Sequence, residues 1–124
     1  EITSTAVNPS TPIIDWNVAK VRLGGTDLLQ EFADLFKSQS PALLVDIHRA
    51  IDNRDIDLLR RSSHTLKGSA SYFGAERLVQ SALQLENLAR AGSFTGTDQM
   101  LVNVELEVER VLAALEAGPP KPTS

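Results

Sequence analysis

The chain has 124 residues, a net charge of −4 and no cysteine, with 42% hydrophobic and 23% charged residues. This length suits one domain with a single hydrophobic core, and the composition is ordinary for a globular protein. The acidic balance argues against a general nucleic-acid binder, which would carry an excess of Lys and Arg. The lack of cysteine excludes disulfides and cysteine-based zinc sites. The longest apolar runs are too short for a membrane span.

The N-terminal half of the chain predicts a short helix followed by a longer one. Apolar residues recur at helical spacing between residues 13 and 117, without the alternation that is typical of strands. Asp15 can cap a short helix that runs to about Leu23 and ends at Gly24-Gly25. Thr26 can cap the next helix, which begins with "DLLQEFADLFKSQ".

A proline divides this second helical segment. Pro41 disfavours a helical conformation in the residue before it, so we expect the helix to be kinked or interrupted at Ser40-Pro41. Helical spacing resumes in "ALLVDIHRAIDN", where Asn53 is the expected stop. His48 in this segment is expected to be an ordinary solvated helix residue.

Two further helices follow along the chain. Asp55 is the expected cap of a helix that runs to about Phe73, with Gly74 as its C-terminal turn. The next helix begins at once with "ERLVQSALQLENLARAG" and closes at Gly92. Its apolar residues recur at helical spacing, so one face should pack against the core.

The last helix completes the predicted architecture. It begins at Thr95 or Thr97, and its "ELEVER" segment is expected to form a solvated face. Short connections between long amphipathic helices imply antiparallel neighbours. We therefore predict an all-α fold, an up-down four-helix bundle with a short extra N-terminal helix.

The two ends of the chain differ in composition from the predicted bundle. Residues 1–12 are rich in Thr, Ser and Pro, and residues 118–124 read "GPPKPTS". We expect a flexible linker over 1–12, the helical bundle over 13–117 and a flexible tail over 118–124. Frayed termini and tethers to a longer chain both remain open.

The stretch "RRSSHTLKGSASYFGA", residues 60 to 75, carries a histidine, a lysine and a glycine within one predicted helix. At about 100° per residue, one face of this helix surrounds His64 within about 60°. That face holds Arg60, Arg61, Lys67, Gly68 and Ser71. Leu66 and Phe73 fall on the opposite side as core anchors, so His64 should face outward in a cationic strip.

Gly68 needs an explanation, because glycine costs ~1 kcal/mol relative to alanine inside a helix. Helical side chains lean toward the N-terminus, so any side chain at position 68 would partly cover His64. Glycine leaves the imidazole open, and Lys67 can bring its ammonium back toward the ring. An exposed neutral imidazole is a competent nucleophile, and the surrounding cations suit a doubly charged phosphoryl group.

Other patterns indicate no further site. A lone surface histidine is most often only a surface residue, which is the interpretation kept for His48. Asp52, Asp55 and Asp57 indicate helix caps and solvated charge rather than a metal site. Gly24-Gly25 alone is a turn signal, so the sequence indicates no Gly-rich phosphate-binding loop. The spacing of its residues also indicates no Ser/His/Asp triad.

The segment "HTLKGSASYFGA" resembles the signature of histidine-containing phosphotransfer (HPt) domains, H-x-L-K-G-[SA]-[SA] followed four residues later by a small turn. The matching positions are His64, Leu66, Lys67, Gly68, Ser69, Ala70, Gly74, Ala75 and Leu78. Arg61 fits the basic residue that the family often has one turn before the histidine. A weaker resemblance extends over residues 14 to 92.

The resemblance implies both a fold and a set of residue roles. The fold is a four-helix bundle with an extra short N-terminal helix, in agreement with the helical pattern. His64 would accept a phosphoryl group from a receiver-domain aspartate and pass it to another receiver. Lys67 would neutralise charge, Gly68 would give access, and Arg61 and Ser71 are candidates for supporting roles.

The residue that orients the imidazole departs from the family pattern. Some members use a glutamine on the following helix, but the position 22 residues after the histidine is Glu86 here. Gln84 lies about 200° away around the helix and is on a different face. Glu86 could accept a hydrogen bond from the ring N–H, which would fix the tautomer, or it could point away.

Three functions are carried forward from the sequence. The leading one is a phosphotransfer module of a two-component phosphorelay. It is a phosphoryl carrier with no kinase activity, ATP site or cofactor of its own, with Mg²⁺ expected on the partner receiver. The alternatives are the substrate-histidine domain of a chemotaxis-type histidine kinase and a helical adaptor that is not phosphorylated.

The same interpretation fixes the expected partners and context. We expect receiver domains of response regulators or of a hybrid sensor kinase as partners, with no nucleic acid and no direct membrane contact. A monomer in the cytoplasm is expected. The chain could be a whole protein or a domain of a hybrid histidine kinase.

Overall fold

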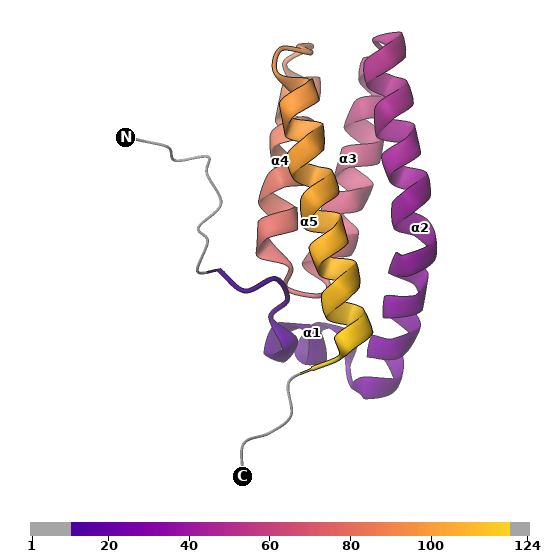
Figure 1. Ribbon diagram of the computed structural model, residues 1–124, viewed down its shortest axis with the longest axis vertical. Coiled ribbons are helices and arrows are strands. Elements are labelled where there is room, and N and C mark those ends of the chain that lie inside the picture. Colours follow the sequence, from indigo (N-terminus) through magenta and orange to yellow (C-terminus); the bar gives the residue numbers. More distant parts are fainter. Residues whose placement is uncertain (1–10, 120–124) are drawn as a thin grey trace.

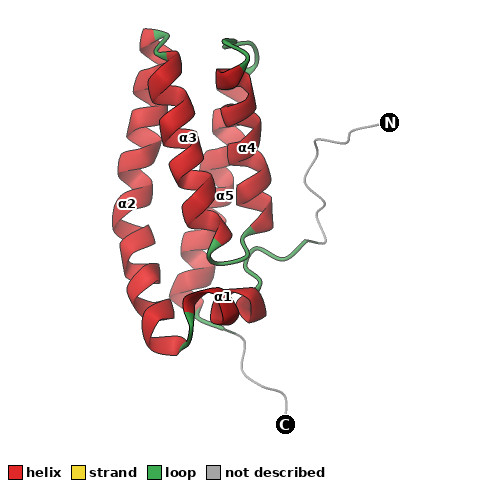
Figure 2. Cartoon of the chain, turned by 180° about the vertical axis from the view of Figure 1, so that it is seen from behind, coloured by secondary structure: helices red, strands yellow, loops and turns green. Residues whose placement is uncertain are grey.

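The structure, a computed structural model, describes residues 11–119. Its elements are five helices: α1 (Trp16–Leu23), α2 (Thr26–Asn53), α3 (Ile56–Ser71), α4 (Glu76–Arg90) and α5 (Thr97–Ala117). The described part of the chain contains no strand. Figures 1 and 2 show α2 to α5 side by side along the long axis and α1 across the lower end of the bundle. The predicted all-α bundle with a short N-terminal helix is confirmed.

The four long helices form a closed ring. α3 packs against both α2 and α4, and α5 packs against α4 and closes the ring against α2. The buried apolar residues of α5 recur at helical spacing and are Leu101, Val104, Val108, Val111 and Leu115. Leu66 and Phe73 are also buried, which places the opposite face of α3 toward solvent.

Two of the three predicted side-chain caps are present in the structure, and the prediction of a cap at Thr26 is wrong, because α2 begins at Thr26 with Gly25 as its N-cap. Asp15 accepts a hydrogen bond from Val18 N at the start of α1. Asp55 accepts one from Leu58 N at the start of α3, the helix that carries His64. Each aspartate satisfies a backbone N–H that has no partner within its helix.

Of the two outcomes expected at Pro41, a kink or an interruption, the interruption is wrong, because α2 is continuous with Pro41 inside it. Proline removes one helical hydrogen bond and costs about 3 kcal/mol. Phe36 and Ile47, one on each side of the proline, are buried against the other helices. Helical geometry through Pro41 keeps both side chains in the core, and the proline itself is exposed.

Gly74 lies in the turn between α3 and α4 and packs closely against Asp15 at the start of α1. The helix ends at Ser71, slightly before the predicted Phe73, and Gly74 has φ +59°. A Cβ atom at Gly74 would lie 2.8 Å from Cβ of Asp15. Asp15 N also donates to the carbonyls of Phe73 and Gly74, at 3.2 Å each. A side chain at this position would therefore push α1 away from the bundle.

The predicted solvated face of α5 needs one correction. Glu107, within "ELEVER", is buried rather than solvated. Its carboxylate meets arginines from two helices, which compensates the charge.

No helix within residues 11–119 is long and apolar enough to cross a membrane. The expected flexible segments 1–12 and 118–124 lie outside the described residues, apart from 11–12 and 118–119.

Candidate phosphotransfer site

His64 lies in the middle of α3, on the side that faces α4. Its side chain is 60% exposed, and Nδ1 lies 2.7 Å from Oε2 of Glu86 on α4. Of the two orientations that the sequence left open for Glu86, the structure has the carboxylate against the ring. A largely exposed imidazole is thus held through one of its two nitrogens.

The Glu86 carboxylate is buried beneath this histidine and compensated by two cations. The side chain is only 1% exposed. Lys67 Nζ lies 2.7 Å from Oε1, and Arg90 Nη2 donates to Oε2 at 2.8 Å. Lys67 comes from α3 and Arg90 from the last turn of α4. The network therefore joins the two helices directly behind His64.

The cations keep Glu86 ionised. Burial alone would raise the pKa of Glu86, but contacts with Lys67, His64 and Arg90 outweigh burial and lower the pKa to about 2. An ionised carboxylate can only accept hydrogen bonds, so Nδ1 of His64 carries the hydrogen in this contact. In the neutral ring, Nε2 then has the lone pair. The contact therefore selects the neutral tautomer with the hydrogen on Nδ1 and the lone pair on Nε2.

Gly68 lies in open space, one turn after His64. A Cβ atom built at Gly68 would have no atom of another element within 4 Å, and the residue is an ordinary part of α3. Close helix packing therefore does not explain this glycine. The open surface beside the imidazole agrees with the predicted access role.

The remaining predicted residues are not brought to the ring. Arg61 is exposed on the turn before His64. Ser71 Oγ donates to the carbonyl of Gly68 at 2.7 Å, and the Ser71 carbonyl accepts from Arg22 of α1. These contacts fix the end of α3, two turns below His64. Their supporting roles stay predictions.

Arg90 is the site residue that the sequence reasoning missed. A signal existed, because Glu86 and Arg90 are four residues apart, the spacing at which opposite charges meet on a helix. The sequence alone did not place Glu86 against His64, so this pair had no link to the histidine.

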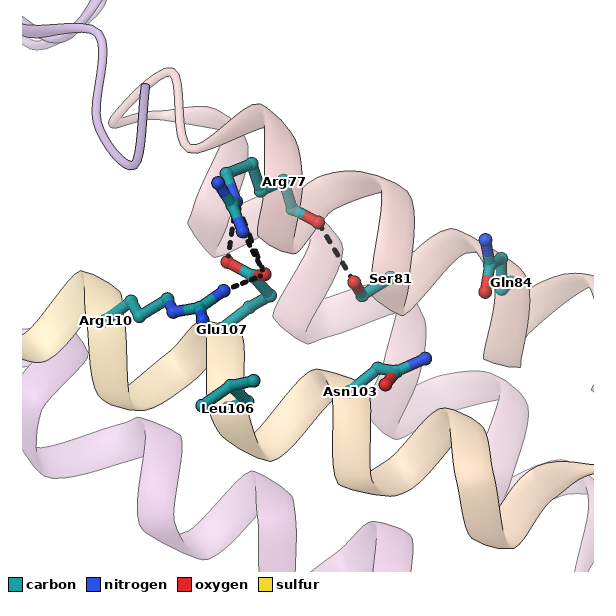
Figure 3. Close-up of a pocket in the computed structure, with 7 residues that line it drawn as sticks. All are labelled: Arg77, Ser81, Gln84, Asn103, Leu106, Glu107 and Arg110. Carbon is teal, nitrogen blue, oxygen red and sulfur yellow. Dashed lines mark hydrogen bonds and ion pairs between the residues drawn. The ribbon is translucent and has the colours of Figure 1, made fainter. Parts of the chain in front are cut away.

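A second polar network lies between α4 and α5 (Figure 3). Arg77 donates to both carboxylate oxygens of Glu107, and Arg110 Nη1 donates to Oε2 at 3.0 Å. They line a cavity of about 340 Å³ together with Ser81, Gln84, Asn103 and Leu106. None of these side chains is a histidine. Within residues 11–119, no group of three or more metal-ligating side chains could hold an ion.

Comparison with known proteins places this site in a family. The sequence pattern of the Hpt domain family matches residues 31–117. The chain belongs to the Hpt domain family. Histidine-containing phosphotransfer protein B from Pseudomonas aeruginosa PAO1 has the same fold, with a TM-score of 0.80 and 27% sequence identity. That alignment covers 87% of this chain and 95% of the Pseudomonas protein.

Two curated relatives are also similar. The phosphorelay protein LuxU of Vibrio cholerae is 38% identical over 58 residues, which are 47% of this chain and 45% of LuxU. Histidine-containing phosphotransfer protein 2 of Arabidopsis thaliana is 27% identical over 96 residues, which are 75% of this chain and 62% of the plant protein. The chain thus spans about half to three-fifths of these relatives.

Family membership confirms the predicted class of function. The chain carries an Hpt domain, a phosphotransfer module of phosphorelays, and such domains are phosphoryl carriers rather than enzymes.

Proposed function

We propose that His64 carries the phosphoryl group, taking it from an aspartyl phosphate on a receiver domain and passing it to the aspartate of another receiver. The observation that supports this most is the contact of His64 Nδ1 with the buried, ionised Glu86, 2.7 Å away. It orients an exposed imidazole so that Nε2 has the free lone pair.

The proposed step conserves every proton. The lone pair of Nε2 forms a bond to phosphorus, the bond from phosphorus to the aspartate oxygen breaks, and the electron pair leaves with the aspartate carboxylate. Nδ1 keeps its hydrogen, so the ring of His64 gains a positive charge. Glu86, which accepts from Nδ1, stabilises that charge. The reverse sequence on a second receiver returns the ring to its neutral form.

Lys67 and Gly68 act on the phosphoryl group and its approach. The Lys67 ammonium belongs to the same network as the ring of His64. Its side chain is long enough to bring the ammonium to the phosphoryl oxygens. Phosphoryl transfer depends mainly on positioning and charge stabilisation, which suits one movable cation. The open surface at Gly68 lets a receiver bring its aspartate to Nε2.

The rest of the reaction belongs to the partner in this proposal. The receiver holds the Mg²⁺ and the acidic pocket, and this chain has no ATP site or kinase activity of its own. It works as a cytoplasmic monomer without nucleic-acid or membrane contact. Residues 13–117 form the working domain in this proposal, either alone or as part of a hybrid kinase.

The test uses a receiver domain carrying ³²P on its aspartate, without ATP or a kinase. We expect acid-labile, base-stable label on the wild-type chain, none on His64→Gln, and full label on His48→Gln. His48 is the matched control. It is an exposed histidine on α2, and its Nε2 lies 2.7 Å from Oε2 of Glu105 on α5. Label that survives in His64→Gln would refute the acceptor. Label that requires ATP and a kinase domain would instead favour the chemotaxis-type substrate domain.

A further inference from the structure

Lys67 has two competing tasks at this site. In the structure its ammonium contacts Oε1 of Glu86, on the side of the ring where Nδ1 lies. Under the proposed function it must approach a phosphoryl group on Nε2, the ring nitrogen farther from Glu86. Lys67 therefore has to change partner when His64 is phosphorylated.

Such a change would normally be opposed by Glu86. The Glu86 side chain is 1% exposed, and a buried charge that loses its counter-ion is strongly destabilising. If Lys67 were the only cation, the carboxylate would hold it in place.

Arg90 supplies the second cation from the opposite carboxylate oxygen. Its Nη2 donates to Oε2 at 2.8 Å, whereas Lys67 contacts Oε1, so the two cations do not share an oxygen. Glu86 with Lys67 and Arg90 sums to one positive charge. When Lys67 leaves, Glu86 and Arg90 still form a neutral pair behind the ring.

We propose that Arg90 is a positioning residue that keeps Glu86 compensated and oriented, so that Lys67 can move from the carboxylate to the phosphoryl group. This inference rests on the proposed function of His64. A purely structural explanation of the ion pair between Arg90 and Glu86 is that it only stabilises the end of α4. This effect would be small, because Arg90 is 61% exposed and an exposed i,i+4 ion pair contributes little to stability. The two explanations differ in what they predict for phosphotransfer.

The experiment measures the rate constant of transfer from a ³²P-labelled receiver domain to the full chain. We expect Arg90→Gln to slow transfer about tenfold and Arg90→Lys to restore most of the rate, since it keeps the cation. Arg110→Gln is the matched control. It removes an arginine that pairs with another buried glutamate, Glu107, away from the histidine, and should transfer at the wild-type rate.

A double-mutant cycle identifies the route of the effect. If Arg90 acts by releasing Lys67, then Arg90→Gln should slow the wild type but add nothing to Lys67→Ala. A second cycle with Glu86→Gln, in which no buried charge remains to be compensated, should also abolish the effect of Arg90→Gln. Because this double variant leaves no unpaired carboxylate, it also serves where Arg90→Gln alone folds poorly.

The outcomes separate the inference from the function on which it rests. If Arg90→Gln transfers at the wild-type rate, or if its loss of rate is fully additive with that of Lys67→Ala, the role of Arg90 is overturned. His64 remains the carrier in both cases. A wild-type chain that takes no label overturns the proposed function itself.

Discussion

Glu86 and Glu107 are both buried, and each carboxylate contacts two cationic side chains. Glu86 on α4 contacts Lys67 of α3 and Arg90 of its own helix. Glu107 on α5 contacts Arg77 of α4 and Arg110 of its own helix. Each network thus bridges two neighbouring helices and carries one surplus positive charge.

The difference lies in what else touches each carboxylate. Glu86 also holds the exposed ring of His64, beside the open surface at Gly68. Glu107 is held by Arg77 through both of its oxygens and faces a polar cavity lined by no histidine (Figure 3). Under the proposed function, the Glu86 network differs from the Glu107 network by the exposed imidazole that it holds and by the open surface at Gly68.

The largest expected effect comes from neutralising each glutamate in turn. We expect Glu86→Gln and Glu107→Gln each to lower the free energy of unfolding by about 2–3 kcal/mol, because each leaves partly buried cations without a counter-ion. Only Glu86→Gln should slow transfer, by about tenfold, since the ring loses an ionic hydrogen-bond acceptor. Urea unfolding at pH 7 and transfer from a labelled receiver measure the two quantities.

Each variant serves as the control for the other. Equal losses of stability with unequal losses of rate would separate the functional network from the structural one. A Glu107→Gln variant that transfers as slowly as Glu86→Gln would show that the comparison is wrong.

Acid should weaken the Glu86 network in a defined pH window. The pKa of Glu86 is lowered from 4.5 to about 2, so its ionised form favours the folded state. The stabilisation is fully present above pH 4.5 and is lost as the pH falls from 4.5 toward 2, by roughly 3 kcal/mol in total. Unfolding free energies measured across this range should fall less steeply for Glu86→Gln than for the wild type. Parallel curves would contradict the assignment.

The part of the site that lies on one helix could be predicted from the sequence. His64, Lys67 and Gly68 are related by positions i, i+3 and i+4, and regular helical geometry alone places them on one face. The core anchors Leu66 and Phe73 follow from the same periodicity. Regular helical geometry was enough for these residues, because their places around α3 depend on no other helix.

Partners on different helices could not be predicted in this way. The contact of Glu86 with His64 depends on how α4 rotates against α3, and the sequence left two orientations open. Glu107 was expected in solvent with the rest of the charged "ELEVER" segment. Its contact with Arg77, 30 residues away on another helix, could not be foreseen. At Pro41, burial of the flanking side chains outweighed the local preference. Tertiary packing decided all three cases.

The smallest expected effect on stability is that of Gly68→Gln. This variant should keep its stability and lose transfer rate, whereas Glu107→Gln should lose stability and keep its transfer rate. No neighbouring element limits a side chain at this position, and glutamine is a better helix former than glycine, so the free energy of unfolding should hold or rise by about 0.5 kcal/mol. Transfer should nevertheless slow several-fold, because the new side chain leans over His64. Gly74→Ala is the control, since its φ of +59° and its closeness to Asp15 should make that variant lose stability. Transfer by Gly68→Gln at the wild-type rate would mean that access to the ring does not explain the glycine.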